Sequence, residues 1–275
     1  MRCHDGIFMG KRIHSALITF LCMFCTQSIA YELDSQVSAS VALVIDPVTF
    51  ELTSGETVRL EGLGSPRAPA DHRDRWPYLI EATEDVRALL SEGHISYVPR
   101  AAPDRYGRVI AQVWLEDGTW LNGALADQGL ARVETTTNQR RCAGDALAHE
   151  FRAREAGLGM WRLSAYEIRR AEETAAFTND FQIVEGLIVS ASEVRGRIYL
   201  NFGEEWRTDF TVTIAPSDVA RFAESGLDPL SWSGQSLRVR GWLEWYNGPQ
   251  IEASHPEQIE FPGGVREEIS NEDDR

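Results

Sequence analysis

The chain has 275 residues and a formal net charge of -15, with 42 acidic side chains against 27 basic ones. This excess of acid opposes binding to a polyanion such as DNA, because nucleic-acid surfaces need clustered positive charge. The length allows one or two domains.

The first thirty residues have the composition of a secretory signal peptide. Lys11 and Arg12 precede an apolar run over 16–25, and small residues lead to a cleavage point near Ala30. That run is too short to cross a bilayer, and no later stretch approaches ~20 apolar residues. We therefore expect a periplasmic or secreted protein without a membrane span. Cys142 would remain as its one cysteine, packed rather than nucleophilic.

Residues 38–163 predict a strand-rich domain with inserted helices. Period-2 alternation predicts strands at 42–52, 57–63, 95–98 and 109–115. Helical spacing predicts helices at 76–90, 120–128 and 143–156, and the last two end at Gly129 and Gly157. This order is typical of the oligonucleotide/oligosaccharide-binding (OB) barrel, which has five strands.

The second half predicts another barrel of the same kind over 181–262. A charged stretch over 164–180 is interpreted as a linker helix. Alternating segments predict strands at 181–190, 197–202, 208–214, 236–245 and 250–254. A helix at 216–225, with Ser217 as its N-cap, falls between the third and fourth strands. The acidic tail, 263–275, is expected to be disordered. The fold class is therefore mainly β with added helices (α+β), with two five-stranded OB barrels.

Two short segments of the first half carry a resemblance. Residues 58–67 read VRLEGLGSPR, and residues 104–108 read DRYGR. With the ending Gly-Leu-Gly-Met-Trp at 157–161, they make residues 41–163 similar to the staphylococcal nuclease (thermonuclease-like) domain family. In that family an apolar strand with an internal arginine leads into Asp-Thr-Pro-Glu, and a Tyr-Gly-Arg turn opens a later strand. The resemblance implies the first barrel.

The resemblance also implies which site residues are kept and which are lost. Arg59, Tyr106 and Arg108 stand at the family's phosphate-contacting positions. The family's two calcium-binding Asp positions are Val48 and Gly64, and the position of its general-base Glu is Arg67. Calcium needs 6–8 oxygen ligands, and a guanidinium cannot accept a proton near neutral pH. We therefore expect no metal, no cofactor and no calcium-dependent cleavage.

An alternative keeps the enzyme active through relocated acids. Carboxylates close to the lost positions could hold Ca²⁺ differently and support an extracytoplasmic nuclease acting on DNA or RNA: Asp46, Glu61, Asp71 and Asp74. Against this, Glu61 alternates with apolar neighbours, which is typical of a solvated strand position. The acids of the loop are equally consistent with surface charge.

The retained arginines give a second hypothesis, an anion pocket. A phosphate or carboxylate could be bound by some or all of five side chains: Arg59, Arg67, Arg105, Tyr106 and Arg108. The competing interpretation is that Arg59 and Arg108 pair with Glu61, Asp104 or Glu150, where surface pairs contribute little.

The expected partner is an unknown anionic ligand or a protein. Thr135 and Thr137 stand where the family has base-stacking tyrosines, which disfavours nucleic acid further. Aromatic residues of the second barrel could form a stacking platform for oligonucleotides or sugars, or could be core. The leading hypothesis is an exported, catalytically inactive thermonuclease-like protein that serves as an anion-binding or interaction module.

Overall fold

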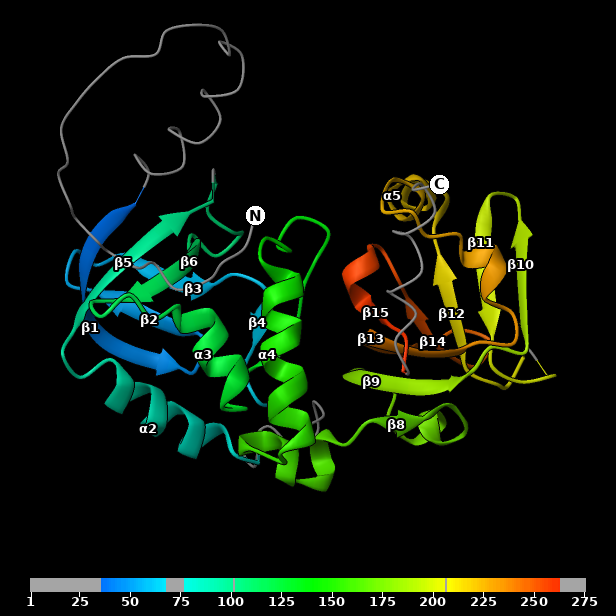
Figure 1. The fold of residues 1–275 in the computed structure, drawn as a ribbon, viewed down its shortest axis with the longest axis horizontal. Helices are drawn as coiled ribbons and strands as arrows, with labels where there is room; N and C mark the ends of the chain where they lie inside the picture. The colour runs from blue at the N-terminus through cyan, green and yellow to red at the C-terminus, as the bar shows by residue number, and fades with distance from the viewer. Residues whose placement is uncertain (1–35, 68–76, 101, 206, 263–275) are drawn as a thin grey trace, which may run out of the picture. The chain divides into compact units, whose positions relative to one another are not determined.

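A computed structural model describes residues 36–67, 77–100, 102–205 and 207–262 (Figure 1). These residues form two compact units. The first unit contains 36–66, 78–133 and 141–160, and the second contains 67, 77, 134–140 and 161–262. The predicted signal peptide, Asp71, Asp74 and the predicted acidic tail lie outside the described residues. Within the described ranges, no helix combines the length and apolar character needed to cross a bilayer.

The first unit is built on a closed five-stranded barrel with the order β1-β2-β3-β6-β5, which confirms the barrel predicted for this half. Its strands are β1 (Val37–Asp46), β2 (Thr49–Leu52), β3 (Thr57–Leu60), β5 (His94–Pro99) and β6 (Val109–Leu115). β3 and β6 run parallel, and the other pairs are antiparallel. Every second side chain along β2 and β3 points into the core, because successive side chains of a strand lie on opposite faces. These core residues are Phe50, Leu52, Val58 and Leu60.

The predicted strand at 42–52 is wrong, because the chain turns back within it. β1 ends at Asp46 and β2 begins at Thr49, and the two pair as a hairpin. Proline lacks an N–H and has a fixed φ, so Pro47 favours a turn over a continuous ladder. Asp46 Oδ1 accepts a hydrogen bond from Val48 N at 2.8 Å, which holds the turn.

Three helices accompany the barrel, as predicted, with shifted ends: α2 (Leu79–Leu89), α3 (Leu121–Asp127) and α4 (Ala143–Glu155). Ala82 and Val86, four residues apart, bury one face of α2. Buried Glu150 of α4 accepts a hydrogen bond from Val133 N at 2.5 Å. That bond ties α4 to β7 (Arg132–Val133), which pairs with β4 (Leu63–Gly64). Cys142 directly precedes α4 as its N-cap residue, with a φ of +58°.

The second unit holds an eight-stranded sheet with the path β10-β11-β12-β14-β13-β9-β8 and β15 paired to β13. Its strands are β8 (Arg169–Arg170), β9 (Asp180–Leu187), β10 (Ser190–Val194), β11 (Arg197–Asn201), β12 (Thr211–Ile214), β13 (Ser236–Trp245), β14 (Pro249–Glu252) and β15 (Ile259–Glu260). The expected number of five strands is wrong. The sheet gains β8 and β15, and the predicted first strand divides into β9 and β10.

The division of that first strand explains the topology. β9 pairs with β13, and Ile188 N still donates to Gln235 O at 2.9 Å. The next residue, Val189, donates to Asn201 O at 2.8 Å, and β10 then pairs with β11. The chain therefore leaves β9, near one end of the strand order, and enters β10 at the opposite end. The strand order of the first barrel recurs, including a parallel pair, β12 with β14.

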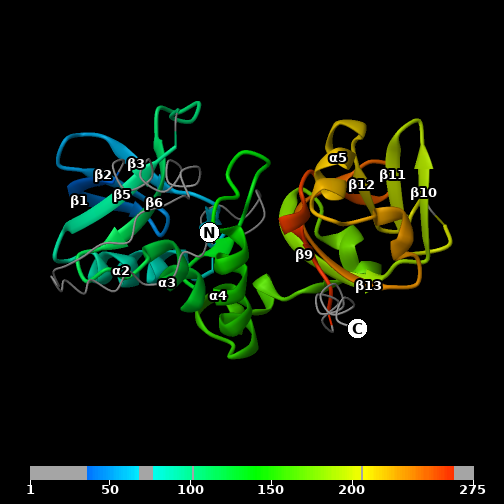
Figure 2. The same ribbon diagram turned by 45° about the horizontal axis from the view of Figure 1, so that its top comes forward.

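α5 (Pro216–Glu224) lies between β12 and β13 in the chain, where the sequence predicted a helix. Its N-cap is Ala215 rather than Ser217, with Pro216 in the first turn. Proline suits that position because its missing N–H would have no partner inside the helix. Phe222 of α5 is buried against Trp232 with ring centroids 6.4 Å apart. Figure 2 shows α5 above the strands of its own unit.

The predicted linker helix is also wrong. The segment forms 3-10 turns at Ser164–Tyr166 and Ala171–Ala176, with β8 between them. β8 pairs in parallel with β9, and Ala171 joins the core of the second unit. A charged stretch favours a solvated helix locally, but pairing with a distant strand stabilises an extended conformation instead.

Candidate functional site

The structure gives the surroundings of the three positions at which we expect the family's acids to be replaced. Val48 is fully buried in the turn between β1 and β2. Gly64 lies in β4, opposite Arg132. Arg67, in the second unit, forms an ion pair with Glu134 at 2.9 Å, and its guanidinium lies 5.8 Å from the centroid of the Trp242 ring. Within the described ranges, no group of three or more His, Cys, Asp or Glu side chains is placed to bind a metal.

The Asp46 carboxylate lies close to Val48 and Gly64, two of the positions at which we expect replaced acids. Its Oδ1 accepts hydrogen bonds from Val48 N and Ser65 Oγ, both at 2.8 Å. Ser65 directly follows Gly64, so Asp46 joins the β1–β2 turn to the end of β4. This carboxylate oxygen has a structural role, whereas a hard cation would need several further oxygen ligands.

Glu61 was interpreted as a solvated strand position, and that is wrong. It follows β3 and its side chain is fully buried. Its carboxylate pairs with Arg100 at 2.5 Å and with Arg141 at 2.9 Å. Asn122 Nδ2 also donates to the Glu61 carbonyl oxygen at 3.1 Å. Two guanidinium groups neutralise this buried charge, so they compete directly with any metal for the carboxylate.

Arg59 stands between buried Val58 and Leu60 on β3, so alternation turns its side chain away from the core. Its Nη2 donates to Leu63 O at 3.1 Å. The first unit thus places Arg59 on β3, a few residues before Gly64.

The turn at 104–108 is tightly ordered by Asp104. Its carboxylate accepts hydrogen bonds from Tyr106 N at 2.9 Å and Arg108 N at 3.0 Å, and pairs with Arg108 Nη2 at 2.6 Å. Burial raises the pKa of Asp104, but the hydrogen bonds from Arg108 and Tyr106 outweigh it and lower the pKa below its ordinary value. Asp104 therefore carries its negative charge at neutral pH.

The same turn displays an exposed aromatic ring between two cations. Tyr106 is 66% exposed. The guanidinium carbons of Arg105 and Arg108 lie 4.8 and 5.0 Å from its ring centroid. Cation–π contacts at exposed sites contribute about 0.5–1 kcal/mol. They keep both guanidinium groups beside the tyrosine ring, where an anionic ligand could be bound.

The competing interpretation is confirmed for Arg108, which pairs with Asp104 at 2.6 Å. Glu150 instead lies 3.7 Å from Arg154. Arg67 belongs to the second unit with Glu134. Binding of one anion by Arg59, Arg67 and Arg108 together stays a prediction.

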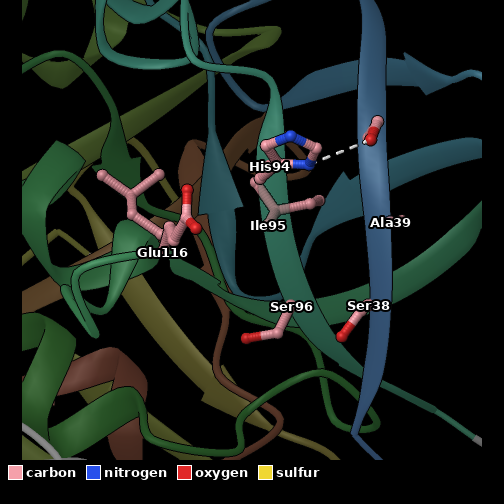
Figure 3. A pocket seen from close by; sticks show the side chains of 8 residues that line it. Ser38, Ala39, His94, Ile95, Ser96 and Glu116 are labelled. Carbon is pink, nitrogen blue, oxygen red and sulfur yellow. Dashed lines mark hydrogen bonds between the residues drawn. The ribbon is translucent and has the colours of Figure 1, made fainter.

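A cavity of about 480 Å³ lies over β1 and β5 in the first unit (Figure 3). Ser40 Oγ and His94 Nδ1, which are cross-strand partners, lie 3.2 Å apart there. A nucleophilic serine needs a histidine whose second nitrogen is oriented by another group. Within the described residues, the second ring nitrogen of His94 makes no hydrogen bond. The pair is therefore a cross-strand contact, which the sequence analysis missed.

The second unit contains a buried histidine that sequence reasoning also missed. His255 is fully buried, with Nε2 2.8 Å from Thr135 Oγ1 and Nδ1 2.9 Å from Ser254 Oγ. Burial lowers the pKa of His255 to about 4; Arg140 and Arg221 act in the same direction, against Glu257. Thr137 Oγ1 donates to Ser254 Oγ at 3.0 Å. Thr135 and Thr137 therefore both belong to this hydrogen-bond network.

His255 lines a cavity of about 360 Å³ together with Arg240, Gln258 and the exposed Trp242. The lining carries both signs of charge, since Glu134, Glu244 and Glu252 also reach it. A neutral imidazole can exchange protons with a ligand when one of its ring nitrogens is available. Both ring nitrogens of His255 are hydrogen-bonded to hydroxyl groups, so we interpret its role as packing and hydrogen bonding.

Comparison with known proteins gives one family. The family model for staphylococcal nuclease homologues matches residues 57–163. The match runs from the start of β3 through the segment that follows α4. It includes Arg59, Gly64, Arg67, Tyr106 and Arg108, and it begins after Val48. No curated protein matches the chain.

Proposed function

We propose, from the premise that residues 57–163 form a staphylococcal-nuclease-like domain, that this protein is a binding protein of nuclease ancestry that does not cleave phosphodiesters. It holds an anionic ligand at the turn 104–108 and Arg59. The signal-peptide pattern of the first thirty residues supports a place of action outside the cytoplasm.

One observation carries the proposal: the positions of the family's acids hold a buried valine, a strand glycine and an arginine paired with Glu134. Hydrolysis needs a group that stabilises charge on the phosphate and a base for the attacking water. Neither Val48 nor Gly64 can supply a carboxylate ligand, and Arg67 cannot act as the base. The nearby acids Asp46 and Glu61 are engaged by protein groups.

The turn at 104–108 supports the binding part of the proposal. Asp104 orders the turn before a ligand arrives, so binding requires little further ordering. Arg105 and Arg108 flank the exposed Tyr106. Guanidinium groups suit phosphate and carboxylate because they present paired N–H donors. The acidic chain as a whole favours a small anion or an acidic group on a protein over a long polyanion.

The test of inactivity is incubation of purified mature protein with single-stranded DNA and with RNA, in Ca²⁺, in Mn²⁺ and in chelator. We expect no cleavage above a protein-free control in any condition. Turnover that survives repurification and disappears with chelator would overturn the proposal in favour of a phosphodiesterase with relocated carboxylates. Asp46→Asn and the pair Asp71→Asn, Asp74→Asn would then identify the acids responsible.

The test of binding is calorimetric titration with inorganic phosphate at low and at high ionic strength. We expect binding that weakens as salt rises, because screening shortens the range of charge interactions. Arg59→Gln and Arg108→Gln should each weaken binding at least several-fold, at about 1.4 kcal/mol per tenfold change. Arg87→Gln, at an exposed arginine of α2, is the matched control and should bind like the wild type. Equal binding by all three variants would refute this site.

A further inference from the structure

The outer face of the second unit's sheet carries a row of uncharged polar side chains. Cross-strand pairing places Ser190 opposite Asn201, Asn201 opposite Thr211, and Thr211 opposite Gln250. The residues that follow them along the strands, such as Val212 and Ile251, are buried in the core. Because side chains alternate along a strand, the row faces away from that core. Figures 1 and 2 show the strands β10, β11 and β12 side by side.

Two tyrosines stand over this row. Tyr199 lies on β11 opposite Ser192, and Tyr246 lies in the turn between β13 and β14. Both line a cavity of about 500 Å³, here called the tyrosine cavity, which falls in the size range of small-molecule sites. Its lining consists of Ser192, Val194, Tyr199, Asn201, Thr211, Tyr246, Asn247 and Gln250.

The lining contains no charged side chain, although a quarter of the whole chain is charged. At one border Arg197 pairs with Glu252 at 2.6 Å, so the charges there neutralise each other. A nucleic-acid strand would need unpaired positive groups along its backbone, and the lining offers none. The chemistry of the cavity therefore fits a neutral ligand.

Several polar groups of the cavity have no protein partner. Within the part of the chain that the structure describes, the side chains of Tyr199, Asn247 and Gln250 make no hydrogen bond. Each amide offers two donors and an acceptor, and a tyrosine hydroxyl offers one of each. A ligand rich in hydroxyl groups would be recognised by such a mixture.

The turn that carries Tyr246 is held in place. Tyr246 N donates to Gly248 O at 2.8 Å. Gly248 has a φ of +108°, which favours glycine, and a Cβ there would lie 3.1 Å from the carbonyl oxygen of Asp209, a tight contact. Tyr246 itself is 70% exposed. An exposed ring on a fixed turn is a ready platform for stacking, because little motion is lost when a ligand covers it.

We propose that the tyrosine cavity binds a neutral carbohydrate. The ring of Tyr246 stacks on the C–H face of a sugar, and Asn201, Asn247 and Gln250 bond to its hydroxyl groups. This inference does not depend on the anion site, which lies on the other unit.

The experiment is calorimetric titration of the whole mature protein with three probes: cellotetraose, tetra-N-acetylchitotetraose and a single-stranded oligothymidylate. We expect at least one of the two neutral oligosaccharides to bind and the oligonucleotide not to bind. Tyr246→Ala should weaken binding about two- to tenfold, the range of an aromatic contact. Gln250→Ala should weaken it as well.

Trp245→Ala is the matched control. Trp245 is 58% exposed and directly precedes Tyr246, yet it does not line the cavity. Its loss should leave oligosaccharide binding unchanged. Failure of both oligosaccharides to bind, or equal effects of Tyr246→Ala and Trp245→Ala, would overturn the proposal. So would oligonucleotide binding that Tyr246→Ala removes.

Discussion

At the scale of single residues, Glu61 shows how a buried charge is stabilised in the first unit. A buried carboxylate loses its hydration, and that cost is recovered only when paired charges surround it. Arg100 and Arg141 supply those charges from separate parts of the chain, and Arg141 Nη2 also donates to Val98 O at 3.0 Å. Glu61 therefore joins three segments of the first unit through one side chain.

The change Glu61→Gln keeps the shape of the side chain and removes its charge. We expect the free energy of unfolding to fall by about 2–3 kcal/mol, below the usual loss for a broken buried pair. The reduction reflects solvent screening, because the arginine side chains are 36% and 29% exposed. Urea unfolding measures the loss, with Glu84→Gln on exposed helix surface as the control, expected within about 0.5 kcal/mol of wild type. A Glu61→Gln protein as stable as the control would contradict the role given to this pair.

At the scale of elements, the end of α4 depends on two glycines with left-handed backbone. Gly157 has a φ of +59° and Gly159 a φ of +53°. A Cβ on Gly157 would meet nothing within 4 Å, whereas one on Gly159 would lie 2.5 Å from the carbonyl oxygen of Gln128. Met160 N also donates to Gly129 O at 2.9 Å. The segment after α4 thus packs directly on the segment after α3.

The alanine variants of the two glycines separate backbone strain from steric overlap. Gly157→Ala should cost about 1–2 kcal/mol, since only the left-handed conformation is penalised. Gly159→Ala should cost about 1–3 kcal/mol more, because the backbone at Gln128 and Gly129 must also move. Parallel urea titrations give the difference. Equal losses of unfolding free energy for the two variants would contradict a destabilising contact between the Cβ of residue 159 and the backbone at Gln128.

At the scale of the whole molecule, two units with barrel-like sheets carry different chemistry. The first unit contains a segment similar to staphylococcal nuclease homologues, with the ordered turn at 104–108 and its arginines. The second unit adds a buried neutral histidine and an uncharged outer cavity. His255 also makes the second unit sensitive to acid, because its pKa of about 4 lies below the ordinary value near 6.5.

The sign of that sensitivity follows from proton binding. Below pH 6.5 the unfolded chain protonates His255 while the folded chain does not, so stability falls with pH down to about pH 4. We expect the second unit to lose about 2 kcal/mol between pH 7 and pH 5 from this residue alone. Urea unfolding of wild type and His255→Gln at both pH values isolates the effect, since other groups titrate alike in both proteins. Identical pH dependence of the two proteins would contradict it.

The sequence by itself determined the features that depend on local periodicity and on turn residues. Alternation predicted β3, β5 and β6 of the first barrel, although it joined β1 and β2 into one strand. Spacing of 3–4 residues predicted α2, α3, α4 and α5. Gly129 and Gly157 marked the helix ends because few other residues adopt a left-handed backbone. The hypothesis that Val48, Gly64 and Arg67 replace the family's acids also comes from the sequence, since it needs only the order of residues along the chain.

Only the tertiary structure decided what each polar side chain contacts. Glu61 has the alternation of a solvated position, yet Arg100 and Arg141 bury it. The stretch after α4 has the composition of a linker helix, yet β9 pairs with it as a strand. The tyrosine cavity combines side chains of β10, β11, β12 and β14 with the turn before β14. The physical reason is the same throughout: periodicity reports which face of an element is apolar, whereas burial and pairing depend on residues that are distant in sequence and meet only in the fold.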